Sequence, residues 1–271
     1  MNETNNDAIR KNVRERYKEI ALLDLQGSDL EGAACSADGC CSMAPPSFDA
    51  VSSQLGYSNE ELSAAPEGAN LGLGCGNPQA IAALKPGEVV LDLGSGAGFD
   101  CFLAASQVGE TGQVIGVDMT PEMVSRARGN AVKGDYTNAE FRLGEIEHLP
   151  VADATVNVII SNCVINLSPD KPQVFHEAYR VLKPGGRLAI SDVITTAELP
   201  AEIKNDLNEL YSGCISGASS AAEITEMLAR SGFSDISIEP KDESVSFIKD
   251  WVPGANVENY IVSAVIQAVK G

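Results

Sequence analysis

A glycine-rich turn between an apolar strand and a helix is the feature that most restricts the fold of this chain. Residues 90–100 read VLDLGSGAGFD, so Gly94, Gly96 and Gly98 directly follow an apolar run. Glycines let the backbone turn sharply there and let a ligand approach without a Cβ clash. Several nucleotide-binding folds use this turn, so the motif alone does not identify the ligand.

Strand, turn and helix patterns alternate from Gly87 onward. The strand patterns lie in EVVLDLGSGAGFD, QVIGVDMTPEMVSRAR, NAEFRLGEIEHLP, ATVNVIISNCVINL and GRLAISDVI. This order predicts an α/β fold with a doubly wound, Rossmann-like parallel sheet and crossover helices. SDISIEP and NYIVSAVIQAVK are predicted to be late strands.

The chain is expected to divide into three regions. Residues 1–65 combine an amphipathic helix, whose expected role is packing, with a cysteine-bearing loop from Gly27 to about Pro46. Residues 66–195 form the sheet domain that holds the glycine turn. Residues 196–271 form a smaller α+β lobe, which includes the acidic, leucine-rich helical pattern AEIKNDLNELYS.

The charge balance argues against two classes of partner. Against 19 Lys and Arg stand 38 Asp and Glu, which gives a formal net charge of −19 over 271 residues. Such a surface repels phosphate backbones and anionic lipids, so neither nucleic acid nor membrane is expected as a partner. The beginning of the sequence has no signal-peptide pattern, and no run of about 18 apolar residues occurs. We therefore expect a cytoplasmic protein.

The cysteine pattern favours reduced thiols. The cysteines are odd in number and spread along the chain: Cys35, Cys40, Cys41, Cys75, Cys101, Cys163 and Cys214. A chain of this size does not need disulfides to hold its core together. There is no CxxC pair and no zinc-finger spacing with His148 or His176, so a structural zinc site is not expected.

Acidic residues near the glycine turn indicate a ligand that combines an adenosine group with a positive charge. Asp118 ends the next strand, at the distance where a carboxylate accepts hydrogen bonds from both ribose hydroxyls. The turn lacks the Gly-Lys-Ser/Thr ending that binds polyphosphate. Asp92 and Asp118 place negative charge beside the pocket, which suits a sulfonium.

The whole series of motifs resembles the class I S-adenosylmethionine-dependent methyltransferases. Gly144-Glu145-Ile146 after the third strand and KPGGRLAI after a later helix complete the resemblance. It implies that Asp92 lies near the methionine part, Asp118 at the ribose, and Met119 against the adenine, with Glu145 and Ile146 at the adenine amine. The full set of residues expected at the cofactor is Asp92, Gly94, Ser95, Gly96, Gly98, Asp118, Met119, Glu145, Ile146 and Asn162. A dehydrogenase uses a similar turn, but a hydride-transfer pair such as His–Asp or Tyr-x-x-x-Lys is missing.

Three cysteines suggest the methyl acceptor. Cys163 closes the fourth strand, at the edge where doubly wound folds carry their chemistry. Cys75 lies in ANLGLGCGNP and Cys214 in YSGCISGA, both among small residues that leave room for a ligand. Soft sulfur ligands select soft, thiophilic centres. Each thiol could instead be a small buried apolar residue, and this alternative is favoured for Cys101, on the apolar side of its helix.

The cysteine motifs resemble the arsenite methyltransferase family. PEGANLGLGCGNP, GVDMTPEM, LGEIEHLPVAD, ISNCVINLSPDK and the late FIKDWVPGANVENYIVSAVIQA carry this resemblance across nearly the whole chain. It implies that arsenite, or its thiol conjugates, is bound as As(III) by Cys163 and Cys214, with Cys75 as the third thiol. It also implies a catalytic redox role for one N-terminal cysteine, Cys35, Cys40 or Cys41. The reductant would be thioredoxin, glutathione or another small thiol.

Two other functions compete with this interpretation. A methyltransferase for a small organic acceptor would share the cofactor motifs, but its chemistry gives no reason for Cys75 and Cys214. A non-catalytic metalloid-binding protein would use the same thiols, but it would not need an intact series of cofactor motifs.

Overall fold

The computed structural model describes residues 3–22, 47–200, 203, 214–252 and 255–271. The predicted loop from Gly27 to Pro46, with Cys35, Cys40 and Cys41, lies outside these residues. So does nearly all of the predicted helix at 201–212.

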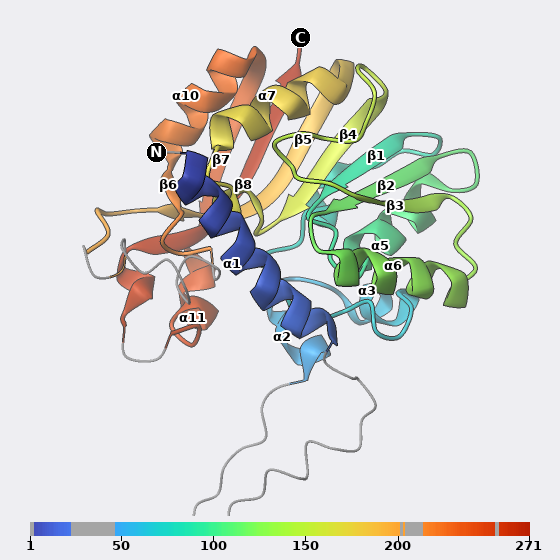
Figure 1. Cartoon of the computed structure of the whole chain (residues 1–271), viewed down its shortest axis with the longest axis horizontal. Helices are drawn as coiled ribbons and strands as arrows, with labels where there is room; N and C mark the ends of the chain where they lie inside the picture. Colours follow the sequence, from blue (N-terminus) through green and yellow to red (C-terminus); the bar gives the residue numbers. More distant parts are fainter. Residues whose placement is uncertain (1–2, 23–46, 201–202, 204–213, 253–254) are drawn as a thin grey trace, which may run out of the picture.

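One mixed sheet organises the described chain (Figure 1). Its strands are β1 (Val89–Leu93), β2 (Gln113–Asp118), β3 (Ala139–Leu143), β4 (Val156–Asn162), β5 (Leu182–Thr195), β6 (Ser219–Ser220), β7 (Phe233–Lys241) and β8 (Ile261–Lys270). The strand order is β3-β2-β1-β4-β5-β8-β7, and β6 pairs with β5. Strands β1 to β5 run parallel, whereas β8 lies antiparallel between β5 and β7. The α/β prediction is confirmed.

Helices cover both faces of the sheet. Those packed on or beside it are α2 (Phe48–Gln54), α3 (Asn59–Ala64), α4 (Gln79–Ala82), α5 (Phe99–Val108), α6 (Pro121–Lys133), α7 (Lys171–Val181), α10 (Ala221–Ser231) and α11 (Val245–Ile248), with short 3-10 turns η1 (Ile165–Leu167), η2 (Asp242–Ser244) and η3 (Val257–Asn259). Neighbouring residues of β1 point to opposite faces. Val90 packs in the cluster with α5 and α6, and Leu91 in the cluster with α7 and α10. Because both faces are buried, the parallel strands read as continuous apolar runs.

The predicted C-terminal lobe contributes directly to this sheet. Strands β7 and β8 both belong to the region 196–271, and β8 pairs along β5 from Arg187 to Thr195. These two strands therefore extend the central sheet instead of forming a sheet of their own. The division into three regions stays a prediction.

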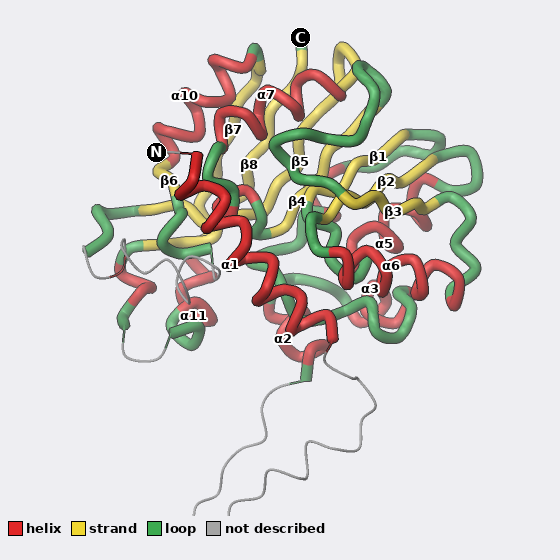
Figure 2. Tube along the Cα trace, in the orientation of Figure 1, coloured by secondary structure: helices red, strands yellow, loops and turns green. Residues whose placement is uncertain are grey.

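Helix α1 (Glu3–Leu22) crosses the carboxyl ends of the parallel strands (Figures 1 and 2). Its apolar residues Ile9 and Val13 pack with Leu167, which follows β4, and with Val193 of β5. The amphipathic pattern thus predicted a helix correctly, and its apolar face covers the edge of the sheet where ligands bind in such folds. No helix among the described ranges is long and apolar enough to cross a bilayer.

Candidate active site

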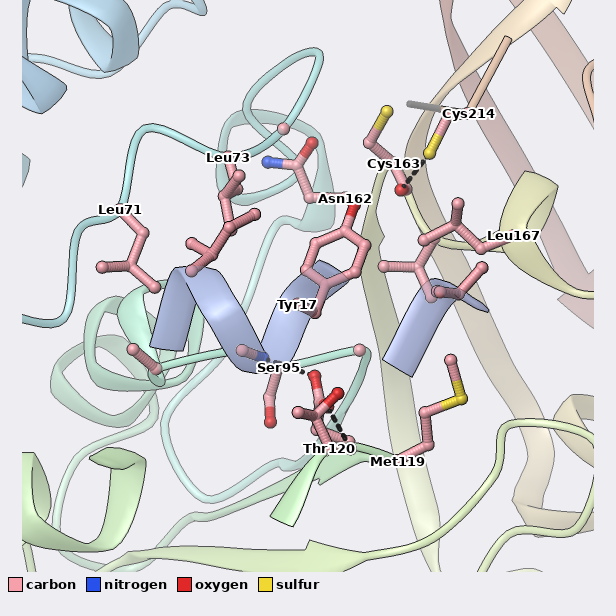
Figure 3. Close-up of a pocket in the computed structure, with 18 of the residues that line it drawn as sticks. Tyr17, Leu71, Leu73, Ser95, Met119, Thr120, Asn162, Cys163, Leu167 and Cys214 are labelled. Carbon is pink, nitrogen blue, oxygen red and sulfur yellow. Dashed lines mark hydrogen bonds between the residues drawn. The ribbon is translucent and has the colours of Figure 1, made fainter. Parts of the chain in front are cut away.

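A cavity of about 730 Å³ opens at the carboxyl ends of β1, β2 and β4, beneath α1 (Figure 3). Figure 3 shows Ser95, Thr120 and Met119 on one side of it and the sulfur atoms of Cys163 and Cys214 on the other. The ring of Tyr17, from α1, lies between the two groups. The volume is in the range of small-molecule binding sites, about 300–1,000 Å³. One cavity therefore joins the glycine turn to the thiols.

The glycine turn forms the floor of the cavity beside β1. The N–H groups of Gly94 and Ser95 both donate to the carbonyl oxygen of Val117, at 2.8 and 3.1 Å. Gly94 has a φ of 69°, and a Cβ atom there would lie 2.4 Å from a methyl group of Val164. Only glycine fits this position, because the backbone is left-handed and the neighbour is close. Gly96 and Ser95 also line the cavity.

Asp118 holds the glycine turn against the next strand. Its carboxylate accepts hydrogen bonds from the N–H of Gly96 at 3.0 Å and from the N–H of Thr120 at 2.8 Å. The Thr120 side chain also forms a hydrogen bond with Asp118. A carboxylate offers about four acceptor positions, so capacity remains for a ribose hydroxyl. Burial raises the pKa of Asp118, although the two N–H groups oppose this effect.

Two further carboxylates lie buried beside the turn, Asp92 at the end of β1 and Asp100 at the start of α5. The Cys101 thiol donates to Asp92 at 3.2 Å, and the Tyr57 hydroxyl donates to Asp100 at 2.8 Å. Burial, then the charge of Asp100, raises the pKa of Asp92, and burial raises that of Asp100 to about 6. Both carboxylates line the cavity, so a cationic ligand there would be favoured.

The predicted adenine residues take different positions. Met119 and Ile146 line the cavity, as expected for contacts with a flat ring. Glu145 does not line it and instead pairs with Arg10 and Arg14 of α1, at 3.5 and 3.6 Å. Its contact with adenine stays a prediction.

The three predicted acceptor thiols converge, and Cys163 and Cys214 line the far end of the cavity, whereas Cys75 does not line it. Cys163 follows β4 directly, and the Cys214 thiol donates to the carbonyl oxygen of Cys163 at 2.7 Å. The sulfur atoms of Cys75 and Cys163, together with a carboxylate oxygen of Asp192, all lie within 4.8 Å of one another. Cys101 is not part of this group and is buried in the apolar cluster of α5. We call Cys75, Cys163 and Cys214 the thiol cluster.

Cys163 and Cys214 both have left-handed backbone conformations, with φ of 57° and 66°. For a side chain that carries a Cβ, such a conformation costs on the order of 1–3 kcal/mol and persists only where the surroundings impose it. Here the N–H of Cys163 donates to the carbonyl oxygen of Ser191 at 2.8 Å, which fixes the chain as it leaves β4. Two of the three converging thiols therefore carry backbone strain of this kind.

The thiols differ in acidity. Hydrogen bonds from the thiols of Cys214 and Cys75 lower the pKa of Cys163 to about 5. The pKa of Cys75 is raised by burial and by its hydrogen bond to Cys163, and that of Cys214 by its hydrogen bond to Cys163 and by burial. Cys163 is therefore the most acidic thiol of the cluster, and Cys75 and Cys214 keep their protons more firmly.

Asn162 connects the cofactor side of the cavity to the Cys75 loop. Its carbonyl oxygen accepts from the N–H of Cys75 at 3.0 Å, and its amide donates to the carbonyl of Gly76 at 2.8 Å and to Tyr57 at 3.0 Å. A Cβ on Gly74 would lie 2.7 Å from the same amide, so the loop approaches Asn162 as closely as glycine permits. Asn162 lines the cavity and also positions the Cys75 loop, and its contact with a cofactor stays a prediction.

Sequence reasoning missed three residues of the site. Asp192 lies within the apolar strand β5, and a single acid in such a run was the available signal. The amphipathic pattern predicts only a packing role for the helix that carries Tyr17, yet Tyr17 lines the cavity. Asp100 follows the glycine turn by two residues and was not distinguished from a helix-capping acid.

Comparisons with known proteins identify the family of this chain. A family model described as a methyltransferase domain matches residues 84–232. An arsenite methyltransferase of Halobacterium salinarum is 54% identical over 97% of this chain, which spans 67% of that relative. An arsenite methyltransferase of Aquipseudomonas alcaligenes is 40% identical over 84% of this chain, which spans 62% of it. The crystal structure of an arsenic(III) S-adenosylmethionine methyltransferase from Chlamydomonas reinhardtii matches with a TM-score of 0.62 and 34% identity, covering 84% of this chain and 75% of the other.

Proposed function

Because this chain belongs to the arsenite methyltransferase family, we propose that it transfers a methyl group from S-adenosylmethionine to trivalent arsenic bound by thiolates. The observation that best supports this proposal is the convergence of three cysteines, two of which line the end of the cavity opposite the glycine turn. The substrate would be arsenite or one of its thiol conjugates. The chain spans about two thirds of its bacterial and archaeal relatives, so the activity is proposed for the residues present here.

S-adenosylmethionine, when bound, supplies a methyl group on a sulfonium cation. The residues of the cavity fit such a group: Asp118 keeps acceptor capacity for a ribose hydroxyl, and Met119 and Ile146 offer an apolar surface for adenine. Asp92 and Asp100 are buried carboxylates whose raised pKa values reflect burial and, for Asp92, the neighbouring charge. A cationic methionine end relieves this cost, because an opposite charge nearby favours the ionised carboxylates.

The thiol cluster would hold the acceptor. Thiolates displace the oxygen ligands of arsenite, and Cys163 is the natural first ligand since its pKa is about 5. Three sulfur ligands leave arsenic pyramidal, with a lone pair free for in-line attack. An acceptor without a proton needs no general base, so the role of the protein is positioning. Correct positioning of two reactants contributes about 7–11 kcal/mol.

A reductant completes the proposed cycle. Accepting a methyl cation uses the arsenic lone pair and raises its formal oxidation state by two. Two thiols that become one disulfide return those two electrons, and thioredoxin, glutathione or another small thiol then reduces the disulfide. We propose Cys75 as one partner and Cys40 or Cys41 as the other, with Cys35 as the alternative.

Serine substitutions test the acceptor site. Cys163→Ser and Cys214→Ser should each lower arsenite methylation roughly a hundredfold or more, about 2.7 kcal/mol, because oxygen is a poor ligand for a soft centre. The assay incubates protein with methyl-labelled S-adenosylmethionine, a thiol reductant and arsenite, and separates labelled methylarsenicals. Calorimetric S-adenosylmethionine binding should be unchanged in both variants.

Cys101→Ser is the matched control, since Cys101 is buried outside the thiol cluster and a hydroxyl can still donate to Asp92. Full turnover by either cluster variant would rule out the proposed acceptor site. Arsenite retained by the wild type without any labelled product would instead favour a metalloid-binding protein. Label found only in an organic acceptor would favour another methyltransferase.

A further inference from the structure

A buried carboxylate joins the thiol cluster. Asp192 lies on β5 with 1% of its surface exposed, and Cys75 is equally buried. One oxygen of Asp192 and the sulfur atoms of Cys75 and Cys163 are within 4.8 Å of one another. Trivalent arsenic on three sulfur ligands has no need of this oxygen, so the proposed acceptor chemistry does not explain why a carboxylate lies beside the two thiols.

The orientation of Asp192 is fixed by its surroundings. It accepts hydrogen bonds from the N–H of Ile165 at 2.9 Å, from the Asn166 amide at 2.9 Å and from the N–H of Val193 at 2.8 Å. A carboxylate has about four acceptor positions, so one remains. Outer hydrogen bonds of this kind typically orient the ligands of metal sites.

The set of donor atoms matches that of a zinc site. Zn²⁺ binds Cys sulfur at about 2.3 Å and carboxylate oxygen at about 2.0–2.2 Å in a tetrahedron, which places the donor atoms about 3.5–3.8 Å apart. The three donor atoms lie within 4.8 Å of one another, up to about 1 Å more than this geometry requires. Because Asp192 is held by its hydrogen bonds, rotation of the Cys75 and Cys163 side chains would have to close this difference. The sulfur of Cys214 contacts the carbonyl oxygen of Cys163 but does not belong to the group of atoms within 4.8 Å, so its side chain would have to turn to become a fourth ligand.

We propose that Cys75, Cys163 and Asp192 form a binding site for a thiophilic divalent cation, with Zn²⁺ as its representative. Cys214 or a water molecule completes the tetrahedron. The site shares two thiols with the proposed arsenic site, so bound Zn²⁺ excludes arsenite; this competition, unlike the zinc site itself, rests on the proposed function. Asp192 then distinguishes Zn²⁺ from arsenic, because its carboxylate oxygen is a ligand of Zn²⁺ and is not a ligand of arsenic.

Calorimetric titration with Zn²⁺ tests the site. The protein is the full chain carrying Cys35→Ser, Cys40→Ser and Cys41→Ser, which removes the other thiols able to bind Zn²⁺, and a phosphine reductant keeps the remaining thiols reduced. We expect one Zn²⁺ per chain. Asp192→Asn should weaken Zn²⁺ binding at least tenfold and change arsenite binding by less than about threefold. Cys101→Ser, which alters the other buried Cys–Asp pair, should leave Zn²⁺ binding unchanged.

S-adenosylmethionine binding by Asp192→Asn reports whether that variant folds. If it does not fold, Cys75→Ser in the same background takes its place and should also lose Zn²⁺. Absence of Zn²⁺ binding, or equal binding by the folded Asp192→Asn variant, would overturn the proposal.

Competition kinetics separate this inference from the proposed function. In the wild type at saturating S-adenosylmethionine, Zn²⁺ should raise the apparent KM for arsenite and leave kcat unchanged. If Zn²⁺ binds and the Asp192→Asn variant weakens this binding, but the wild type methylates no arsenite, the proposed function is refuted and the Zn²⁺ site is not. Methylation that is insensitive to Zn²⁺ would refute the competition.

Discussion

The thiol of Cys163 is the side chain on which the proposed chemistry depends most. It emerges from β4 in a left-handed conformation and receives hydrogen bonds from two other thiols. Neither property can be read from the tetrapeptide Ser161-Asn162-Cys163-Val164. The donors come from residues 88 positions before Cys163 and 51 positions after it, as the numbering of Cys75 and Cys214 shows. A single residue thus obtains its reactivity from two distant ones.

Alkylation of Cys163 should follow its lowered pKa. Iodoacetamide reacts with thiolates, so its rate at Cys163 should rise to half its maximum near pH 5 and stay high above that, because the ionised form prevails above the pKa. An ordinary thiol reaches its midpoint near pH 8.5. Mass spectrometry of the modified peptide gives the rate at each pH.

Cys214→Ala is the informative variant for this experiment. It removes a hydrogen-bond donor to the Cys163 thiolate, so the midpoint should move to higher pH. A wild-type midpoint near that of an ordinary thiol would contradict the assignment. So would a midpoint that the substitution leaves unchanged.

Among the elements, α1 has the largest effect on the site. Every other residue that lines the cavity comes from Ala69 onward in the chain, well beyond the end of the helix at Leu22. Even so, Val13 and Tyr17 of the helix close one side of that cavity. Arg10 reaches Glu147 at 3.2 Å, and Glu147 also accepts from Ser168 at 2.7 Å. Since Glu147 is buried, this ion pair fixes the helix over the cofactor end of the cavity.

Arg10→Ala should weaken S-adenosylmethionine binding about tenfold or more, about 1.4 kcal/mol. The substitution leaves the Glu147 carboxylate buried without its cation, and this cost favours release of α1. Calorimetry measures the affinity, and hydrogen exchange of residues 3–22 measures the docking of the helix.

Arg14→Ala provides the matched control for α1. Arg14 pairs with the partly exposed Glu145 at 3.6 Å, and exposed pairs contribute about 0–1 kcal/mol. Equal losses of affinity in the two variants would show that Glu147 does not fix the helix. Faster exchange in α1 without a loss of affinity would show that the helix is not needed for cofactor binding.

At the level of the whole molecule, one sheet carries both halves of the reaction. The ends of β1 and β2 supply the cofactor side, and the ends of β4 and β5 supply Cys163 and Asp192. Cys75 and Cys214 come from the loops before α4 and before β6. Strands β7 and β8 extend this sheet, and Ser263 of β8 donates to the carbonyl oxygen of Cys75 at 2.6 Å. The C-terminal strands therefore support the acceptor site from within the same core.

The net charge of −19 predicts that salt stabilises the folded chain. Like charges repel most in the compact state, and the screening length falls from about 10 Å at 0.1 M salt to about 3 Å at 1 M. The melting temperature in KCl should therefore rise between these concentrations, by about 2–4 °C for each kcal/mol gained. Scanning calorimetry measures the rise.

A variant with less negative charge serves as the comparison. Glu67 and Glu110 are exposed, and Glu67→Gln with Glu110→Gln should raise the melting temperature at low salt and reduce the further gain from KCl. A melting temperature that does not change with KCl, or falls, would show that charge repulsion does not limit stability.

The sequence by itself determined the features that depend on neighbouring residues. The glycine turn, the apolar strands and α1 were all readable, because φ preferences and side-chain periodicity act over a few residues. The α/β class and the family membership were predicted correctly on this basis. The convergence of the cysteines was expected only through resemblance, since no local pattern relates Cys75 to Cys214.

Only the tertiary structure decided which distant side chains meet. The pairing of β4 with β5 brings Asp192 beside Cys163, and the same fold turns Glu145 toward α1 and away from the cavity. Strand order and register set these contacts, and both depend on the packing of the whole sheet. The glycine turn could therefore be predicted from eleven consecutive residues, whereas the thiol cluster and Asp192 come together only once the sheet has formed.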